Sequence, residues 1–261
     1  MGVSLPMLEL LGLTREQGGR ALVDRLSLRV EVGELLLLVG ASGSGKTTTL
    51  KMINRLVEPT AGEVRIGGRR HDEEPAHLLR RRIGYVFQGV GLFPHLTVAE
   101  NVAVTPLLLG WGVKRVRSRV DELLALVQLE PARFRDRLPA ELSGGEQQRV
   151  GIVRALAAEP PLVLLDEPFG ALDPLTREVL QEAFAALQRE LRFTAVFVTH
   201  DVVEAVLLAD RIAVLRAGKL LQVGTANELL RSPADADVAG LMATPRRQAQ
   251  ALAGKLGSAQ A

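Results

Sequence analysis

The chain lacks cysteine and is poor in aromatic residues, and both absences limit what it can be. With no cysteine among 261 residues, disulfide bonds and thiolate metal sites are excluded. The same absence fits a reducing compartment. Aromatic residues make up 3% of the chain, with one tyrosine and one tryptophan, so few side chains could stack on a flat ligand.

The chain also lacks an excess of either charge and any long apolar run. Its net charge of +2 gives no argument for nucleic-acid binding. The most apolar stretches are residues 35–39 and 102–113, far shorter than the ~20 residues that a membrane helix needs. The N-terminus, MGVSLPMLELLGLTREQ, has no basic start followed by an apolar run, so we expect no secretory signal. Hydrophobic residues reach 47%, enough for a sizeable core.

Short apolar runs alternate with helical patterns along much of the chain. We predict buried strands at residues 35–39, 162–165, 194–199 and 212–215. We predict helices at residues 47–56, 147–158, 176–192 and 202–208. This alternation predicts an α/β fold with a mainly parallel sheet.

The remaining regions have a different texture. The first thirty residues alternate loosely, which predicts an N-terminal antiparallel β edge. Residues 96–158 show helical patterns, as at 116–127, and no convincing buried strand. We therefore predict an α/β core over about 1–88 and 159–232, an inserted helical subdomain over about 89–158, and a C-terminal tail over 233–261 that begins as a helix and ends frayed.

The stretch GASGSGKT at residues 40–47 matches the pattern G-x-x-x-x-G-K-[ST] in full. It follows a predicted strand and opens a predicted helix, and this context argues against a chance glycine-rich turn. Such glycines let the loop wrap a polyphosphate with its N–H groups, Lys46 reaches the β- and γ-phosphates, and Thr47 offers a hydroxyl to Mg²⁺. The predicted ATP-binding loop is Gly40, Ala41, Ser42, Gly43, Ser44, Gly45, Lys46, Thr47 and Thr48.

Two acids end the predicted strand LVLL, at Asp166 and Glu167. On their own they read as solvated residues at a strand end. Beside a phosphate-binding loop, Asp166 can hold Mg²⁺ and Glu167 can orient or deprotonate the water that attacks the γ-phosphate. We therefore predict Asp166 as a metal ligand and Glu167 as the catalytic base.

His200 and Gln88 are weaker candidates. His200 ends the strand TAVFVT, and ligands of open α/β sheets collect at the carboxyl ends of strands. Its position alone leaves a structural role equally open. Gln88 in IGYVFQ could reach Mg²⁺ or water through its amide, but by itself it is unremarkable.

The octapeptide LSGGEQQR, residues 142–149, places two glycines at the start of a helical pattern. Ser143 followed by Glu146 fits a capping box, which accounts for an ordinary helix start. Gly144 and Gly145 are not explained in that way. An anion site built from backbone N–H groups and the positive end of the helix is the alternative, and the stretch alone does not decide between the two.

Together these motifs resemble the ATP-binding subunits of ABC transporters, over about residues 7–232. The resemblance implies that Gln88 sits at the Q-loop, Ala171, Leu172 and Asp173 at the D-loop, and His200 at the switch histidine. It implies Mg²⁺ held through Thr47, Gln88 and Asp166, and catalysis by Glu167, His200, Lys46 and Gln88. It also implies a head-to-tail homodimer in which ATP on one copy meets Ser143, Gly144, Gly145 and Glu146 of the other, with Asp173 close by.

A narrower resemblance lies in the segments NRLVEPTAGEVRIGG and IGYVFQGVGLFPHLTVAENVAVTPLLLGW. They are similar to the ATPases of osmoprotectant importers for glycine betaine, choline or carnitine. This implies two membrane-spanning permease partners, a solute-binding protein and a place at the cytoplasmic face of the membrane. Residues 89–95 are where we expect the permease to bind; the alternative is an apolar turn that packs the helical insert onto the core.

The chain departs from the family pattern at three points. Gln17 occupies the place where an aromatic residue usually stacks on adenine, and so we predict modest ATP affinity. Glu146 stands where the family often has glutamine, from which we draw little. No regulatory CBS domains are expected after residue 232, which weakens the argument for osmotic gating.

Other functions remain to be weighed against the importer motor. The cargo could be another small solute, such as an amino acid. A non-transport ABC ATPase is disfavoured by the single phosphate-binding loop and the lack of sustained heptads. A regulator that binds ATP without hydrolysing it is disfavoured by Glu167.

Overall fold

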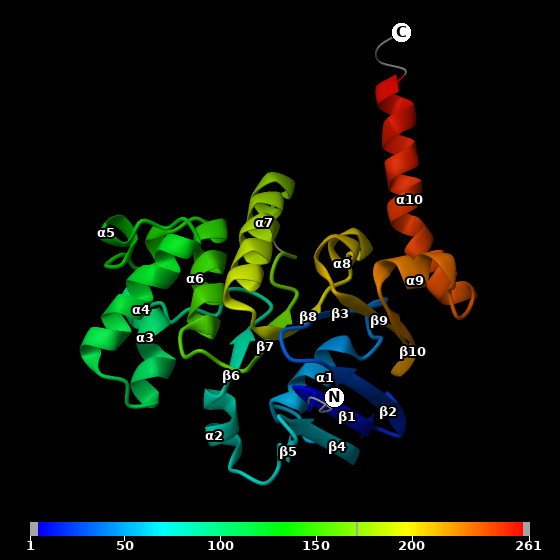
Figure 1. Ribbon diagram of the computed structural model, residues 1–261, viewed down its shortest axis with the longest axis horizontal. Coiled ribbons are helices and arrows are strands. Elements are labelled where there is room, and N and C mark those ends of the chain that lie inside the picture. Colours follow the sequence, from blue (N-terminus) through cyan, green and yellow to red (C-terminus); the bar gives the residue numbers. More distant parts are fainter. Residues whose placement is uncertain (1–4, 171, 258–261) are drawn as a thin grey trace.

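The computed structural model describes residues 5–170 and 172–257 (Figure 1). Its centre is a six-stranded sheet in the order β10-β9-β3-β8-β7-β6. The five parallel strands are β3 (Leu35–Val39), β6 (Ile83–Val86), β7 (Leu162–Asp166), β8 (Thr194–Val198) and β9 (Arg211–Arg216). β10 (Lys219–Gly224) pairs antiparallel with β9 at one edge. The predicted α/β fold with a mainly parallel sheet is therefore confirmed.

A second sheet is antiparallel and has four strands in the order β2-β1-β4-β5. They are β1 (Leu8–Gln17), β2 (Arg20–Val30), β4 (Ala61–Ile66) and β5 (Arg69–Arg70). The antiparallel N-terminal strands that the sequence predicts are present, and they pair with β4 in a sheet of their own.

Side-chain alternation along β3 divides the core into two clusters. Leu36 and Leu38 pack with the antiparallel sheet and with α1 (Lys46–Ile53) on one face. Leu35, Leu37 and Val39 pack on the other face, which helices cover. This strand is buried on both faces because successive side chains point to opposite sides.

The predicted helical region contains α3 (Val98–Leu108), α4 (Val113–Leu126), α5 (Pro131–Phe134), a 3-10 turn (Pro139–Glu141) and α6 (Gly144–Leu156). The apolar run at 102–113 forms the second half of α3 and the turn into α4. Trp111 lies in that turn, and the guanidinium of Arg115 in α4 is 3.3 Å from the centroid of its ring. Among the residues described, no helix is both long and apolar enough to span a bilayer.

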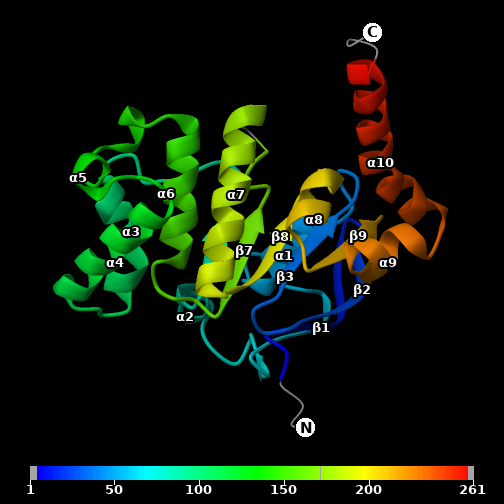
Figure 2. The same ribbon diagram turned by 45° about the horizontal axis from the view of Figure 1, so that its top comes forward.

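The other helices are α2 (Ala76–Arg81), α7 (Pro174–Leu191), α8 (Val202–Leu208), α9 (Ala226–Arg231) and α10 (Ala236–Gly257). In both views α7 stands between α6 and α8 (Figures 1 and 2). α10 starts against the core, where Val238 and Met242 are buried, and then extends away from the other elements. The frayed end predicted after this helix, residues 258–261, lies outside the described residues.

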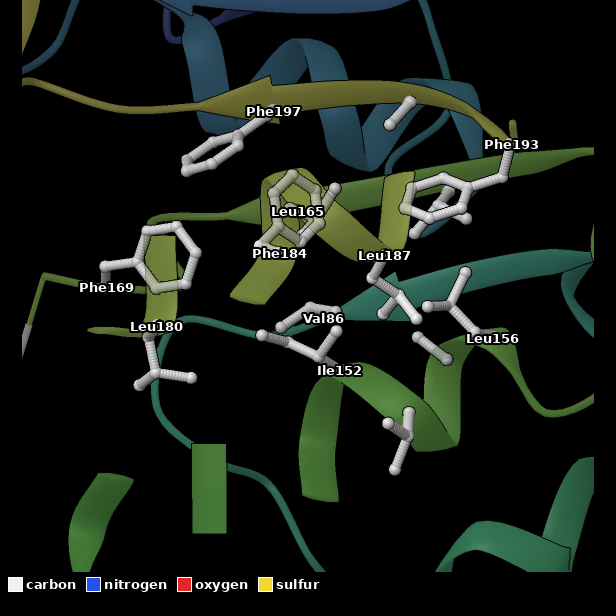
Figure 3. Packing of buried hydrophobic residues seen from close by; sticks show 14 of the residues in the cluster. Val86, Ile152, Leu156, Leu165, Phe169, Leu180, Phe184, Leu187, Phe193 and Phe197 are labelled. Atoms are coloured by element: carbon white, nitrogen blue, oxygen red, sulfur yellow. The ribbon is translucent and has the colours of Figure 1, made fainter. Parts of the chain in front are cut away.

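Four of the phenylalanines form one cluster along β8, from Phe193 just before the first residue of that strand to Phe197 near its carboxyl end (Figure 3). The rings of Phe169, Phe184, Phe193 and Phe197 meet edge to face, with centroids 5.6 to 6.0 Å apart. Aromatic pairs in this geometry add about 0.5–1.5 kcal/mol each beyond their buried area. The cluster supports two turns of the site, because Phe169 follows Glu167 closely and Phe197 precedes His200.

Candidate active site

The candidate site lies where β3, β7 and β8 end. In the parallel register Leu38 is opposite Val198, and Val198 is opposite Asp166. The loop at 40–45, the Asp166–Glu167 pair and His200 therefore leave the sheet at the same edge, as the sequence predicts. Ligands of open α/β sheets bind at this edge.

The loop between β3 and α1 is closed around its own lysine. Lys46 Nζ donates to the carbonyl oxygens of Gly40, at 2.7 Å, and Ala41, at 3.0 Å, and lies 3.4 Å from Ser44 Oγ. Burial lowers the pKa of Lys46, while the charges of Glu167 and Asp166 raise it. The ammonium is held by oxygen atoms that an oxyanion ligand could replace.

Thr47 and Asp166 come together from α1 and β7, as the metal prediction requires. Thr47 Oγ1 donates to Asp166 Oδ1 at 2.8 Å. Asp166 is 3% exposed, and burial raises the pKa of its carboxyl, against the hydrogen bond from Thr47, which lowers it. A hydroxyl and a carboxylate side by side are hard oxygen donors of the kind that Mg²⁺ prefers.

Glu167 is the centre of the site. Its φ of 45° lies in the left-handed region, which is uncommon for residues other than glycine and frequent at functional turns. Its N–H donates to Val198 O at 3.0 Å. Its Oε2 accepts from Gln88 Nε2 at 3.4 Å and lies 3.3 Å from His200 Nδ1. The structure thus brings Gln88 and His200 to the same carboxylate oxygen.

The capping box predicted for LSGGEQQR is present at the start of α6. Ser143 Oγ accepts from the Glu146 N–H at 3.3 Å, and Glu146 Oε2 accepts from the Ser143 N–H at 2.7 Å. The Ser143 hydroxyl also donates to Glu146 Oε2 at 2.8 Å. These hydrogen bonds, the backbone one first, lower the pKa of Glu146, so its carboxylate is held charged beside the helix start.

The two glycines at the start of α6 have different surroundings. A Cβ on Gly144 would meet nothing within 4 Å, whereas a Cβ on Gly145 would lie 2.5 Å from Thr176 Cγ2 of α7. Gly145 therefore permits close packing between α6 and α7 within one chain. Gly144 is exposed, and no contact inside the described chain accounts for it.

Asp173 stands at the start of α7, where its Oδ1 accepts from the Thr176 N–H at 3.1 Å. Its carboxylate is exposed, and hydrogen bonding to Thr176 lowers its pKa. Leu172 precedes it, and Ala171, the first residue of the predicted D-loop, lies outside the described residues.

Gln17 lies at the tip of the hairpin between β1 and β2, exposed and paired with Arg20. The start of β2 runs against the phosphate-binding loop, because a Cβ on Gly45 would lie 2.6 Å from Leu22 O. Leu22, which lies against the loop, is five positions along the chain from Gln17. The role of Gln17 at the adenine position stays a prediction.

A groove lies between the core and the helical region. It has a volume of 490 Å³, and its lining includes Phe87, Gly91, Phe93, Val104 and Arg154. Phe87 and Phe93 expose 45% and 43% of their surface, which is high for large apolar side chains. Two of these residues, Gly91 and Phe93, belong to the segment 89–95 that the sequence predicts as a partner contact.

A polar cluster lies behind His200 that no motif in the sequence predicts. It comprises Gln181 and Arg177 on α7, and Asp201 and Glu204 at the start of α8. The sequence feature that points to this cluster is Glu204, an acidic residue within the apolar run VVEAVLL. Among the residues described, no group of three His, Cys, Asp or Glu side chains is arranged to hold a metal ion.

Comparison with known proteins agrees with this geometry. The family profile described as ABC transporter matches residues 23–170. The chain is 54% identical over 220 residues, 84% of its length, to the choline transport ATP-binding protein OpuBA of Bacillus subtilis (strain 168), of which the match covers 57%. It is 49% identical over 224 residues, 86% of its length, to the osmoprotectant import ATP-binding protein OsmV of Salmonella typhimurium, covering 59% of that protein.

Two further matches are informative. The glycine betaine uptake system ATP-binding protein YehX of Escherichia coli (strain K12) is 47% identical over 229 residues, 88% of this chain and 74% of that protein. A dimeric post-hydrolysis state of the ATP-binding cassette MJ0796, bound to ADP and Pi, is a solved structure with a TM-score of 0.73 and 36% identity. That match covers 84% of this chain and 98% of the other.

The chain spans less than three fifths of the length of the first curated relatives that it matches, at 57% for OpuBA and 59% for OsmV. The profile match covers more than half of the chain, and the identities lie far above chance. The family and fold predicted from the sequence are therefore confirmed, and the chain belongs to the ABC transporter family, among its ATP-binding proteins.

Proposed function

We propose that the chain binds and hydrolyses ATP as the motor subunit of an ABC importer. The observation that carries the proposal is the convergence at one sheet edge of Lys46, the Thr47–Asp166 pair, and Glu167 in contact with His200. Phosphoryl transfer to water needs a loop that carries a lysine, oxygen ligands for a metal ion, and a carboxylate held by a polar partner.

In this proposal residues 40–48 cradle the triphosphate. Lys46 leaves the carbonyl oxygens of Gly40 and Ala41 and pairs with phosphate oxygens instead, a stronger, charge-assisted contact. The start of α6, with Ser143, Gly144, Gly145 and Glu146, serves the nucleotide of a second copy, and Asp173 faces the same interface. The dimeric state of the similar cassette MJ0796 supports a homodimer.

The residues present fit a magnesium ion. Thr47 Oγ1 and Asp166 Oδ1 are 2.8 Å apart, and together with phosphate oxygens, the Gln88 amide oxygen and water they would supply the oxygen ligands that Mg²⁺ prefers. When bound, the ion neutralises charge on the phosphates. Asp166 is buried, so a cation beside it would offset the cost of keeping its carboxylate charged.

Hydrolysis in this proposal is in-line attack of water on the γ-phosphate. Glu167 orients and deprotonates that water, and its strained backbone directs the carboxylate out of the sheet edge. His200, 3.3 Å from Glu167, steadies the γ-phosphate, and Gln88 aligns the carboxylate through the same oxygen atom. Lys46 balances the charge that spreads over the phosphate oxygens.

The proposed cargo is an osmoprotectant or quaternary amine, such as glycine betaine or choline. The names of OpuBA, OsmV and YehX support this class. The alternative is another small solute: a sulfate/thiosulfate import ATP-binding protein of Bradyrhizobium diazoefficiens is 44% identical over 239 residues.

The proposed assembly has two copies of this chain, two membrane permeases and, indirectly, a solute-binding protein. The 490 Å³ groove with exposed Phe87 and Phe93 is where we place the permease, in preference to a simple packing turn at residues 89–95. The chain would then lie peripherally at the cytoplasmic face of the membrane. We assign residues 1–232 to the ATP-binding domain, with the core at about 1–88 and 159–232, the helical subdomain at about 89–158, and a tail at 233–261.

Two experiments test the motor. Glu167→Gln should nearly abolish ATP hydrolysis and trap an ATP-bound dimer, visible by size-exclusion chromatography; normal turnover would remove Glu167 from its role. Because the chain has no cysteine, Ser42→Cys and Ser143→Cys can be introduced on separate copies and cross-linked. Cross-links between copies that depend on ATP are expected, and cross-links confined to single chains would contradict the dimer.

Cargo is tested in cells. Deleting the gene should abolish uptake of radiolabelled betaine or choline, and restoring it should restore uptake, whereas the Glu167→Gln form should not. Unchanged betaine and choline uptake together with lost sulfate uptake would move the proposal to the alternative cargo.

A further inference from the structure

The direction of the His200 imidazole depends on the turn that carries it. The side chain is 63% exposed, and its Nδ1 lies 3.3 Å from Glu167 Oε2. Which rotamers such an exposed side chain can adopt depends on the φ and ψ angles of its own residue, and which groups it reaches depends on where its backbone lies. The residues on either side, Thr199 and Asp201, therefore decide where the imidazole points.

Hydrogen bonds fix Thr199 to the sheet and Asp201 to the start of α8. Thr199 is buried, its N–H donates to Leu38 O at 3.2 Å, and its Oγ1 accepts from the Asp201 N–H at 3.0 Å. Asp201 caps α8 through Oδ1, which accepts from the N–H groups of Val203, at 2.9 Å, and Glu204, at 3.3 Å. Asp201 Oδ2 is turned toward α7.

Arg177 on α7 connects this turn to the one that follows Glu167. Its Nη1 lies 3.9 Å from Asp201 Oδ2, and its Nη2 donates to Leu172 O at 3.1 Å. A guanidinium is a rigid, planar fork, so both contacts are fixed by one group. One turn further along α7, Gln181 Nε2 donates to Glu204 Oε1 at 2.8 Å, which keeps α7 and α8 aligned.

Little empty space lies between these groups on the side that faces the protein. The cavity enclosed by Glu167, Arg177, Thr199, His200 and Glu204, together with Phe169 and Gly170, has a volume of only 10 Å³. That is about the space of one water molecule. On its other side the Arg177 side chain is 33% exposed, so its contacts with Leu172 O and Asp201 Oδ2, and not confinement, link the two turns.

We propose that Arg177 is a positioning residue, which ties the turn at Leu172–Asp173 to the turn at Thr199–Asp201 and so holds the His200 imidazole toward Glu167. The inference rests on the proposed ATPase function and acts through His200. Loss of the link frees the imidazole, which lowers the rate of the chemical step, because misplacing a reacting group by about 1 Å can cost 10²-fold. ATP binding on the phosphate loop is left almost intact.

The test is steady-state ATP hydrolysis by the purified full chain. Arg177→Met should lower kcat by about 10-fold or more while KM for ATP changes by less than about 2-fold, the pattern of an interaction needed in the transition state. Arg177→Lys should recover part of kcat, because it keeps the charge but not the fork. The matched control is Arg189→Met, an exposed arginine on the same helix, which should retain wild-type kcat.

A second variant avoids any change on α7. Asp201→Asn keeps a good helix cap but removes the charge that faces Arg177, and it should lower kcat with little change in KM. Wild-type kcat in both Asp201→Asn and Arg177→Met would overturn the inference, as would an equal loss in Arg189→Met.

Coupling to His200 separates positioning from general stability. In a His200→Ala background, measured by single-turnover hydrolysis, Arg177→Met should lower the residual rate by less than about 2-fold, since residues that act through one another are not additive. An additive loss of about 10-fold or more would overturn the inference. Failure of the proposed function is distinct, because the unaltered chain would then hydrolyse no ATP or would be insensitive to Glu167→Gln.

Discussion

Replacing each glycine at the start of α6 by alanine tests why both are present. A Cβ at 145 would lie 2.5 Å from Thr176 Cγ2, whereas one at 144 would meet nothing within 4 Å. Overpacking a closed contact costs about 1–3 kcal/mol, and alanine gains up to about 1 kcal/mol over glycine in a helix. We expect Gly144→Ala to raise the free energy of unfolding slightly. The free energy of unfolding of Gly145→Ala should be about 1–3 kcal/mol lower than that of Gly144→Ala.

The assay is urea denaturation of the purified chain, followed by circular dichroism. Equal slopes would let the midpoints be compared directly as stabilities. Thr176→Ser removes the methyl group that the new Cβ meets and leaves the backbone N–H that Asp173 accepts. The double variant Gly145→Ala/Thr176→Ser should therefore regain most of the lost stability, because contacting residues couple.

Two results would refute this reasoning. One is equal stability of the Gly144→Ala and Gly145→Ala variants; the other is a double variant no more stable than Gly145→Ala alone. ATP-dependent dimerisation of the stable Gly144→Ala variant then reports separately on the partner subunit, because position 144 has no steric role within its own chain.

Three further predictions concern nucleotide, metal and pH. Gln17→Tyr should tighten ATP binding about 5-fold or more in calorimetry if a stacked ring adds ~1 kcal/mol or more, and unchanged affinity would contradict the stacking argument. Asp166→Asn keeps the contact with Thr47 but removes a charge, so hydrolysis should need at least about 10-fold more Mg²⁺; an unaltered Mg²⁺ titration would exclude Asp166 as a ligand. Burial lowers the pKa of His71, so the unfolded chain binds a proton near pH 6.5 that the native chain does not, and stability should fall between about pH 7 and pH 5. His71→Leu should flatten that pH dependence of the urea midpoint, and an equally steep dependence would show that His71 is not its source.

The elements of the core could be predicted because their signals are local. Buried parallel strands are continuous apolar runs, so β3, β7, β8 and β9 were found within a residue or two. Helix ends were predicted less accurately. α1 ends at Ile53 instead of residue 56 because Arg55 takes a φ of 56° and Asn54 Oδ1 accepts from the Leu56 N–H.

Other elements could not be predicted because tertiary contacts decide them. β6 was missed since Gly84 interrupts its four residues, yet a Cβ there would lie 2.4 Å from Ala155 O of α6, so packing selects glycine. β10 and α2 were not predicted, because their apolar residues follow no clear helical or strand period.

In the site, motifs predicted residues that lie at the end of a β-strand or just after it, such as Asp166 and His200. Spacing along the chain could not reveal that Arg177 reaches Asp201 from another helix.

The scarcity of aromatic residues has a practical consequence. Trp111 is the single tryptophan, and it sits under Arg115 in the turn between α3 and α4, at the outer end of the helical region. Its fluorescence therefore reports on that region alone, with no engineered dye. A shift of its emission on addition of ATP would show that binding at the phosphate loop changes the surroundings of Trp111.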